Sequence, residues 1–347
     1  MPCKLLKLIL RDRLFRCILP CSYYMHMKKV FCIGELLIDF VAENQGNDLS
    51  KAHVFTKKAG GAPANVACAI NKLGGYAAFI GALGKDAFGD FLWNTLETHQ
   101  IDMSLAQRTE TFTTLAFVSI DANGERDFVF SRGADKELQY DPSVKHLFNQ
   151  QMVHFGAATS FLGGKLEEAY GHYMFDALTQ DAFISFDPNF RGDLWKNNPD
   201  TFIKKCLPFI EKSHLCKFSL EEALLLSGAA DTISACDILH AHGVPIICIT
   251  MGEKGTLVST AKAKKQIPSA AVNPIDTTGA GDAFIGSLLC QISTLPTPLE
   301  QLQEASETLY DMVAKANIAG ALTTTQYGAI AAIPSKEDLE KYQISGT

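Results

Sequence analysis

Long apolar runs are missing from this 347-residue sequence, since no stretch reaches the roughly 18 uninterrupted apolar residues that a membrane-spanning helix requires. The body of the chain also has no long basic stripe, and the formal net charge is −7. Nucleic-acid binding depends on clustered Lys and Arg that neutralise phosphates. Neither a membrane nor a nucleic acid is therefore the expected partner.

Zinc-site spacing is missing as well, because the ten cysteines form no CxxC pair and no Cys/His cluster. Cys17 and Cys21 come nearest to such a pair, and coincidence explains them better. Four others lie inside apolar runs, where a free thiol behaves as a small buried hydrophobic group: Cys32, Cys68, Cys248 and Cys290. The pattern favours reduced thiols in a cytoplasmic protein.

Both common nucleotide fingerprints are also absent. The sequence contains neither G-x-x-x-x-G-K-[ST] nor G-x-G-x-x-G. Their absence disfavours a P-loop protein and a dinucleotide-dependent oxidoreductase.

The first 26 residues carry five basic side chains and one acid, Asp12, among leucines and isoleucines. One interpretation is a targeting or membrane-surface segment. The other is a leader translated from an upstream start, with the domain opening at Met27. Basic residues at positions 11, 13 and 16 interrupt the apolar part, which argues against a secretory signal. We therefore favour the leader and expect one domain over 27–343.

Short apolar segments alternate with longer amphipathic ones from Val30 onward. The expected strands are Val30–Ile33, Ala77–Gly81, Met152–Phe155, Phe183–Asp187, Leu215–Phe218 and Ile246–Thr250. The expected helices between them include Ala64–Leu73, Phe88–His99, Leu166–Leu178 and Pro199–Lys212. Strands that are apolar throughout and separated by helices indicate a doubly wound, mostly parallel α/β sheet. Such a sheet binds its ligands outside the carboxyl ends of the strands.

One region breaks this alternation. Thr113–Asp121 and Glu125–Arg132 are β-rich and flank Asn123-Gly124, a dipeptide that tolerates a tight hairpin turn. With the extended segment His53–Lys57, they predict a small antiparallel sheet with strands from about 40–58 and 112–133. An ordinary surface hairpin, a substrate lid and a dimer surface all fit this pattern.

The segment DTTGAGDAF, residues 276–284, precedes an apolar run that predicts a buried helix beginning near Gly279. A helix N-terminus has unpaired N–H donors and partial positive charge, so it attracts phosphate. Asp282 falls in the first turn and would be ionised at neutral pH, ready to take a proton from an alcohol. The alternative is that Asp282 only caps the helix.

DTTGAGDAF resembles the C-terminal motif of the ribokinase-like (PfkB) carbohydrate kinases. The resemblance runs from about Val30 to Pro334 and is nearest to the fructokinase branch. It is carried by AGGAPANVA (59–67), GELLIDFVAE (34–43), TTLAFVSIDANGERDFVF (113–130), FDPNFRGDLW (186–195) and TTTQYGAIAAIP (323–334).

The resemblance implies a catalytic centre and a sugar site. Asp282 would be the base, and the backbone of Gly279, Ala280 and Gly281 would form an anion hole. Six residues would lie in or near the sugar site: Asp39, Gly60, Gly61, Asn65, Arg132 and Arg191. Carboxylates and amides suit paired sugar hydroxyls, and neighbouring glycines allow close backbone approach.

The resemblance also implies a nucleotide site and metal ions. Ser219-Leu220-Glu221-Glu222 matches the family's N-x-x-E element with Ser in place of Asn, and Glu222 would act on Mg²⁺ through water. Thr250, Gly252 and Gly255 would form a phosphate turn. Asn317 would border the adenine. Asp276 and Thr278, with the loop around Gly328, resemble the monovalent-cation site of some members, for which K⁺ is the candidate ion.

The implied activity is transfer of the ATP γ-phosphate to D-fructose, giving fructose 6-phosphate. The alternatives are 2-keto-3-deoxygluconate kinase, ribokinase and nucleoside kinase, or a non-catalytic binding protein of the same fold. Intact motifs around Asp282 and Gly60-Gly61 disfavour the last. By analogy with relatives, a homodimer formed through the lid is expected.

Overall fold

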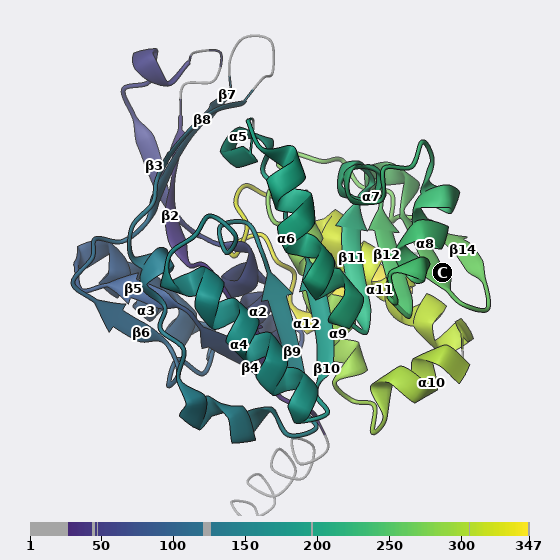
Figure 1. Ribbon diagram of the computed structural model, residues 1–347. Coiled ribbons are helices and arrows are strands. Elements are labelled where there is room, and N and C mark those ends of the chain that lie inside the picture. Colours follow the sequence, from purple (N-terminus) through teal and green to yellow (C-terminus); the bar gives the residue numbers. More distant parts are fainter. Residues whose placement is uncertain are drawn as a thin grey trace, which may run out of the picture.

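The computed structural model describes residues 27–43, 46, 48–120, 126–195, 197–304 and 306–345, and Figure 1 shows their arrangement. Eight strands form the main sheet in the order β14-β13-β12-β11-β10-β9-β1-β4. They are β1 (Val30–Ile33), β4 (Ala77–Ile80), β9 (Met152–Gly156), β10 (Phe183–Asp187), β11 (Leu215–Ser219), β12 (Ile246–Thr250), β13 (Thr256–Thr260) and β14 (Lys264–Ile267). Every neighbouring pair in the part of this order that runs β12-β11-β10-β9-β1-β4 is parallel. This confirms the predicted fold class.

The last two strands were not predicted. β13 pairs antiparallel with both β12 and β14 and extends the sheet at one edge. Their sequences, TLVST and KKQI, mix polar and apolar residues, so they lack the continuous apolar signature of the parallel strands.

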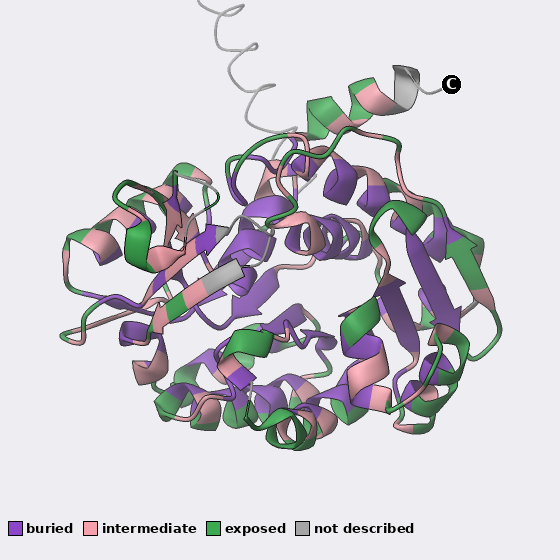
Figure 2. Ribbon diagram, turned by 90° about the horizontal axis from the view of Figure 1, so that it is seen from above, coloured by how far each residue is buried: buried purple, intermediate pink, exposed green. Residues whose placement is uncertain are grey.

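The core lies on both faces of the main sheet, because successive side chains of a strand point to opposite faces. Val30 and Cys32 join one hydrophobic cluster, whereas Phe31 and Ile33 join the other. The first face is covered by α2 (Ala62–Lys72), α3 (Ala87–Thr98), α9 (Ala280–Ile292), α10 (Pro298–Glu304), α11 (Ser306–Thr323) and α12 (Lys336–Ser345). The second is covered by α4 (Lys165–Thr179), α5 (Gly192–Trp195), α6 (Pro199–Lys212), α7 (Leu220–Ser227) and α8 (Thr232–Ala241). Figure 2 shows the buried strands between these helical layers.

A second sheet of four strands, in the order β3-β2-β7-β8, rises from one side of the main body (Figure 1). Its strands are β2 (Leu37–Ala42), β3 (Phe55–Gly60), β7 (Leu115–Ile120) and β8 (Arg126–Ser131). We call it the lid. Two of its pairings are antiparallel, and the central pairing of β2 with β7 is parallel. The Asn123-Gly124 turn lies outside the described residues.

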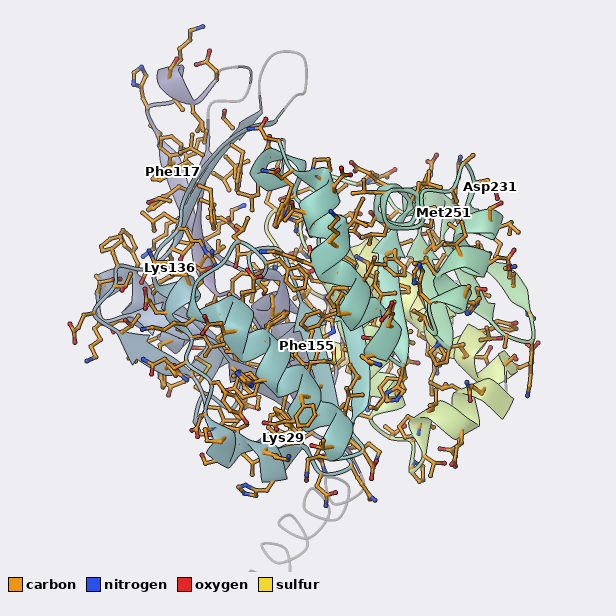
Figure 3. All side chains as sticks on the ribbon, in the orientation of Figure 1. Lys29, Phe117, Lys136, Phe155, Asp231 and Met251 are labelled. Atoms are coloured by element: carbon orange, nitrogen blue, oxygen red, sulfur yellow. The ribbon has the colours of Figure 1, made fainter. Side chains whose placement is uncertain are left out.

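Aromatic side chains hold the lid together. The rings of Phe40 and Phe117 stack with centroids 5.1 Å apart, and Phe88 of α3 meets Phe40 edge-on at 5.7 Å. Figure 3 labels Phe117 on the lid, away from the buried Phe155 of the main sheet. The contact between Phe40 and Phe88 thus fastens the lid to α3 of the main body.

The remaining elements are short: β5 (Ala82–Gly84) and β6 (Gln107–Thr109), which pair with each other, and the 3₁₀ turns η1 (Leu49–Lys51), η2 (Ala134–Glu137), η3 (Pro142–Phe148) and η4 (Gly252–Lys254). Among the residues that the structure describes, no helix is both long and apolar enough to cross a membrane. The described cysteines, Cys32, Cys68, Cys248 and Cys290 among them, are free and buried, as expected of small hydrophobic groups.

Candidate active site

The N-terminus of α9 lies where the DTTGAGDAF segment predicts it. Gly279 is the N-cap with φ +79°, and a methyl group there would lie 2.8 Å from the Ala329 Cα, so only glycine fits. Ala280–Ile292 then form the helix, whose side chains are almost all buried. The first turn directs backbone N–H groups out of the helix end, as an anion site requires.

Asp282 occupies that first turn and is buried, with 7% of its surface exposed. The Asn65 Nδ2 donates a hydrogen bond to its Oδ2 at 2.8 Å, which joins residues 217 positions apart. Burial raises the pKa of Asp282 to about 6, against the Asn65 hydrogen bond that lowers it, and the charge of Asp187 raises it further. The carboxylate is therefore a base whose pKa lies just below neutral pH.

Four of the predicted sugar residues, Asp39, Gly60, Gly61 and Asn65, lie on β2, on β3 and at the start of α2. Antiparallel pairing of β2 with β3 brings Asp39 over Gly60, where a methyl group would overlap the Asp39 carboxylate. Gly61 follows with φ +113°, and a methyl group there would lie 2.5 Å from the Glu35 carbonyl oxygen. Gly61 is also the N-cap of α2, the helix that carries Asn65. Both glycines are thus required by the close approach of neighbouring backbone and side chains.

Glu35 belongs to the same cluster and was not predicted. It is 1% exposed, and its Oε1 accepts a hydrogen bond from the Ala62 N–H at 3.0 Å. Its Oε2 has no hydrogen-bond partner among the described residues, and neither has the Asn65 Oδ1. Burial raises the pKa of Glu35 to about 8. In the sequence, only the position of Glu35 just after the first predicted strand suggested that it belongs to the site.

The two predicted arginines differ in their surroundings. Arg132 donates from Nε to the buried Asp135 Oδ2 and from a terminal nitrogen to the Thr159 carbonyl oxygen, both at 3.1 Å. It therefore fastens the base of the lid to the main body. Arg191 donates to the Asn189 Oδ1 at 2.7 Å, and its charge lowers the pKa of both Asp282 and Glu35.

A buried ion pair beneath α9 was also not predicted. Lys217 of β11 contacts Asp187 of β10, with Nζ 3.0 Å from Oδ2. Both side chains are buried. A methyl group on Gly281 would lie 3.0 Å from the same Nζ, which places the ammonium directly under the first turn of α9. A lone Lys inside the apolar strand LCKFS gives little signal in the sequence.

The predicted N-x-x-E element is a capping box at the start of α7. The Ser219 Oγ accepts from the Glu222 N–H at 3.1 Å, and the Glu222 Oε2 accepts from the Ser219 N–H at 2.7 Å. The Glu222 Oε1 accepts from the Phe190 N–H at 2.7 Å. Both oxygens of this buried carboxylate thus contact backbone donors.

The other predicted nucleotide residues lie at the carboxyl end of β12 and on α11. Thr250 ends the strand and donates to the Phe218 carbonyl oxygen at 3.2 Å, while Gly252 and Gly255 bound a one-turn 3₁₀ helix with φ of +58° and +81°. Asn317 is buried; its Oδ1 accepts from the Thr256 hydroxyl at 2.6 Å, and its Nδ2 donates to the carbonyl oxygens of residues 267 and 268.

The predicted cation residues form a hydrogen-bonded loop before α9. The Asp276 Oδ1 accepts from the Thr278 N–H at 2.9 Å and from its hydroxyl at 2.6 Å, and the Oδ2 accepts from the Gly328 N–H at 2.8 Å. Burial opposes ionisation, yet these bonds and the charge of Lys58 hold the pKa of Asp276 below its usual value. The described ranges contain no group of three His, Cys, Asp or Glu residues able to hold a metal ion by themselves.

Comparison with known proteins agrees with this arrangement. The sequence model of the pfkB family carbohydrate kinases matches residues 27–336. The chain belongs to this family. The carbohydrate kinase expected from the sequence is thereby confirmed. Probable fructokinase-4 of Arabidopsis thaliana is 36% identical over 317 residues, covering 90% of this chain and 95% of the relative.

Solved structures show the same fold for this pfkB kinase. The fructokinase of Xylella fastidiosa with bound ATP superposes with a TM-score of 0.82 at 30% identity, covering 92% of this chain and 100% of that one. A double mutant of the Vibrio cholerae fructokinase, bound to fructose, ADP and a potassium ion, gives a TM-score of 0.79 at 30% identity, covering 91% and 98%.

Proposed function

We propose that this chain transfers the γ-phosphoryl group of ATP to D-fructose and releases fructose 6-phosphate and ADP. The observation that carries the proposal is the placement of Asp282, a buried carboxylate in the first turn of α9 that accepts a hydrogen bond from Asn65, in the first turns of the helix that follows Gly60 and Gly61. A base between a polar sugar site and an anion-binding helix end is what phosphoryl transfer to an alcohol needs.

In the proposed step, the oxygen of a sugar hydroxyl attacks the γ-phosphorus of ATP. The bond between that phosphorus and the β–γ bridging oxygen breaks, and its electron pair leaves with ADP. The hydroxyl proton passes to Asp282, which is ionised above a pKa of about 6. Backbone N–H groups of Gly279, Ala280 and Gly281 would stabilise charge on the transferring group.

The proposed sugar site uses Asp39, Asn65, Gly60 and Gly61. The carboxylate and amide would hold hydroxyls. The glycines would allow the close packing of the Asp39 side chain and the Glu35 backbone that shapes this site. Arg191 would act in the same site, which its influence on the pKa of Asp282 supports. Arg132 would contribute indirectly through its bonds to Asp135 and Thr159.

The proposed ATP site lies at the carboxyl ends of β11 and β12. It would be formed by Ser219, Glu222, Thr250, Gly252, Gly255 and Asn317. Asn317 is committed to hydrogen bonds within the protein, so it would shape the site through the backbone that it holds. Glu222 also holds backbone N–H groups, but each of its oxygens keeps a lone pair that remains available.

Magnesium fits as the divalent ion of the nucleotide. Each Glu222 carboxylate oxygen accepts one backbone hydrogen bond and retains a second lone pair, so the side chain can hold a Mg²⁺-bound water. The ion would neutralise phosphate charge. Potassium is proposed at Asp276 and Thr278, whose side chains supply carboxylate and hydroxyl oxygens.

We further propose a cytoplasmic homodimer that pairs through the lid. Val54, beside β3, and Val129, on β8, are 49% and 52% exposed, which supports an apolar contact there. The proposed domain is 27–343, with residues 1–26 as a leader that lies outside the described residues.

A panel of sugars assayed for ADP release tests the proposal. D-Fructose should give the highest kcat/KM, with an absolute need for ATP. Strong preference for ribose, a nucleoside or an acidic keto sugar such as 2-keto-3-deoxygluconate would contradict the fructose assignment. Absence of turnover with every sugar would favour a non-catalytic binding protein.

A further inference from the structure

The ion pair joins Asp187, the last residue of β10, to Lys217 in the middle of β11, directly below the proposed phosphate site. The Lys217 Nζ is 3.0 Å from the Asp187 Oδ2 and would be 3.0 Å from a methyl group on Gly281. Its charge lowers the pKa of Asp282, and the charges of Asp282 and Glu222 in turn raise its own. The ammonium therefore faces the first turn of α9 and is surrounded by the carboxylates of the site.

A buried ion pair is seldom kept for stability. Removing two charges from water costs several kcal/mol per ion, and apolar replacements of similar volume are often as stable. Desolvation lowers the pKa of Lys217, but the nearby carboxylates outweigh it and the group stays charged. A permanent positive charge beside an anion-binding helix end has a chemical use in phosphoryl transfer, where negative charge spreads over the transferring group.

The Ser at position 219, where the N-x-x-E element has Asn, also supports a catalytic use of the Lys217 charge. Successive side chains of a strand alternate, so Lys217 and Ser219 lie on one face of β11. The Asn of the N-x-x-E pattern could offer an amide N–H to a phosphate, whereas here the Ser219 hydroxyl oxygen accepts the Glu222 N–H. Lys217, two residues earlier on that face, adds an ammonium donor to the Ser219 hydroxyl, which keeps its own O–H.

We propose that Lys217 is a further catalytic residue, whose ammonium contacts the transferring phosphoryl group at the N-terminus of α9, and that Asp187 is a positioning residue that holds it there. This inference rests on the proposed phosphoryl transfer. Lys217 stabilises the equatorial oxygens while Asp282 takes the hydroxyl proton, so the two residues serve opposite ends of the same step.

The direct test is Lys217→Met, which keeps the length of the side chain and removes its charge. We expect kcat to fall about 10²–10³-fold, the loss typical of one strong transition-state donor, with the fructose KM within about threefold of wild type. An unchanged kcat overturns the inference. Lys29→Met is the matched control, because Lys29 pairs with Asp102 at 2.5 Å just before β1, at the opposite end of the sheet (Figure 3).

Removal of Lys217 leaves Asp187 buried and unpaired, which can unfold a protein. The double variant Asp187→Asn/Lys217→Met removes both charges and keeps the inference testable. It should melt near the wild-type temperature and show the same loss of kcat as Lys217→Met. A folded double variant with wild-type kcat overturns the proposal.

A transition-state analogue separates a catalytic role from a structural one. Fluoroaluminate with ADP, Mg²⁺ and fructose mimics the transferring phosphoryl group, so its binding should weaken about 10²-fold or more in Lys217→Met, while ADP alone binds as in wild type. Equal weakening of both would mean that Lys217 only shapes the nucleotide site, and the inference would be wrong.

Asp187→Asn tests the positioning role through the pH profile. Besides Asp187, the titratable groups near Lys217 are Asp282 of α9, Glu222 of α7 and His154 of β9. Loss of the Asp187 charge lowers the pKa of Lys217, so the alkaline limb of kcat should move to lower pH. A profile that keeps its alkaline limb would contradict the assignment of Asp187.

These outcomes are distinct from failure of the proposed function. If wild type prefers another sugar to fructose, the fructose assignment fails, and the Lys217 variants are compared with that sugar. If no sugar is phosphorylated, the fluoroaluminate experiment still decides the role of Lys217, using ADP and Mg²⁺ alone. Equal binding by wild type and Lys217→Met then overturns it.

Discussion

The sugar side and the nucleotide side of the proposed site are built differently. Three buried polar atoms on the sugar side have no hydrogen-bond partner among the described residues: Glu35 Oε2, Asn65 Oδ1 and Asn189 Nδ2. On the nucleotide side, both Glu222 oxygens and both polar atoms of the Asn317 side chain contact the protein itself. The sugar side therefore has side-chain atoms available to a ligand, whereas on the nucleotide side the side chains hydrogen-bond mainly to the protein's own backbone.

This contrast teaches where recognition should come from. A buried polar atom without a partner costs about 1–3 kcal/mol, and a sugar hydroxyl can satisfy it. Side-chain substitutions on the sugar side should therefore change sugar affinity with little loss of stability. On the nucleotide side, they should first change the stability of the fold. Asp282 lies where the two sides meet.

The largest expected effect belongs to Asp282→Asn. Loss of the base should lower kcat roughly 10²–10⁴-fold, because general-base catalysis contributes that much. ADP binding, measured by calorimetry, should stay within about threefold of wild type. Wild-type turnover in the variant would show that Asp282 only caps α9, and a parallel loss of ADP binding would show that it belongs to the nucleotide side.

The same variant should be more stable than wild type at neutral pH. Burial raises the folded-state pKa of Asp282 from 3.8 to about 6, so its contribution to stability is greatest at low pH and is lost as the pH rises through about 6. Asn removes this cost of a buried charge, on the order of 1–3 kcal/mol. Thermal unfolding of both proteins at pH 5 and pH 8 checks the sign, since the gain should be larger at pH 8.

Asp39→Ala addresses the sugar side alone. Loss of one charged hydrogen bond costs about 1.5–3 kcal/mol, so kcat/KM for fructose should fall roughly 10–150-fold while the KM for ATP stays unchanged. Glu43→Ala is the matched control, because Glu43 follows the same strand and accepts from the exposed Thr56 hydroxyl at 2.7 Å. A rise in the KM for ATP would show that Asp39 also affects nucleotide binding, so that the two sides do not act independently.

The pH dependence of turnover is a smaller effect. Asp282 must be ionised to accept a proton, so kcat/KM for fructose should fall about tenfold for each pH unit below its pKa of about 6. A plateau follows above that value. A profile that is flat down to pH 4.5 would exclude Asp282 as the base.

Much of this site was predictable because its signals are local. The short segment DTTGAGDAF contains both Gly279 and the acid in the first turn of α9, so both can be recognised from neighbouring residues. β10 and β12 were predicted with the observed bounds for the same reason, since each is a short apolar run. These elements needed no knowledge of distant contacts.

The rest depends on contacts between strands. Lys217 meets Asp187 across 30 residues, and Glu35 meets Ala62 across 27, so neither partner is visible beside the other in the sequence. A lone Lys in an apolar strand is the one hint of a buried charge. The parallel pairing of β2 with β7 could not be predicted either, because the hairpin pattern indicates only that β7 pairs with β8.

Glu222→Gln is expected to have the smallest effect on turnover and a clear effect on stability. The side chain accepts from two backbone N–H groups, those of Phe190 and Ser219, and Gln can accept only one because its amide nitrogen is a donor. The free energy of unfolding should therefore fall by about 1–3 kcal/mol. Melting should occur several degrees lower, and the KM for ATP should rise no more than about threefold. The neighbouring exposed Glu221→Gln is the control and should melt like wild type. An unchanged melting temperature together with a large rise in the KM for ATP would show that the nucleotide side also recognises its ligand through side chains.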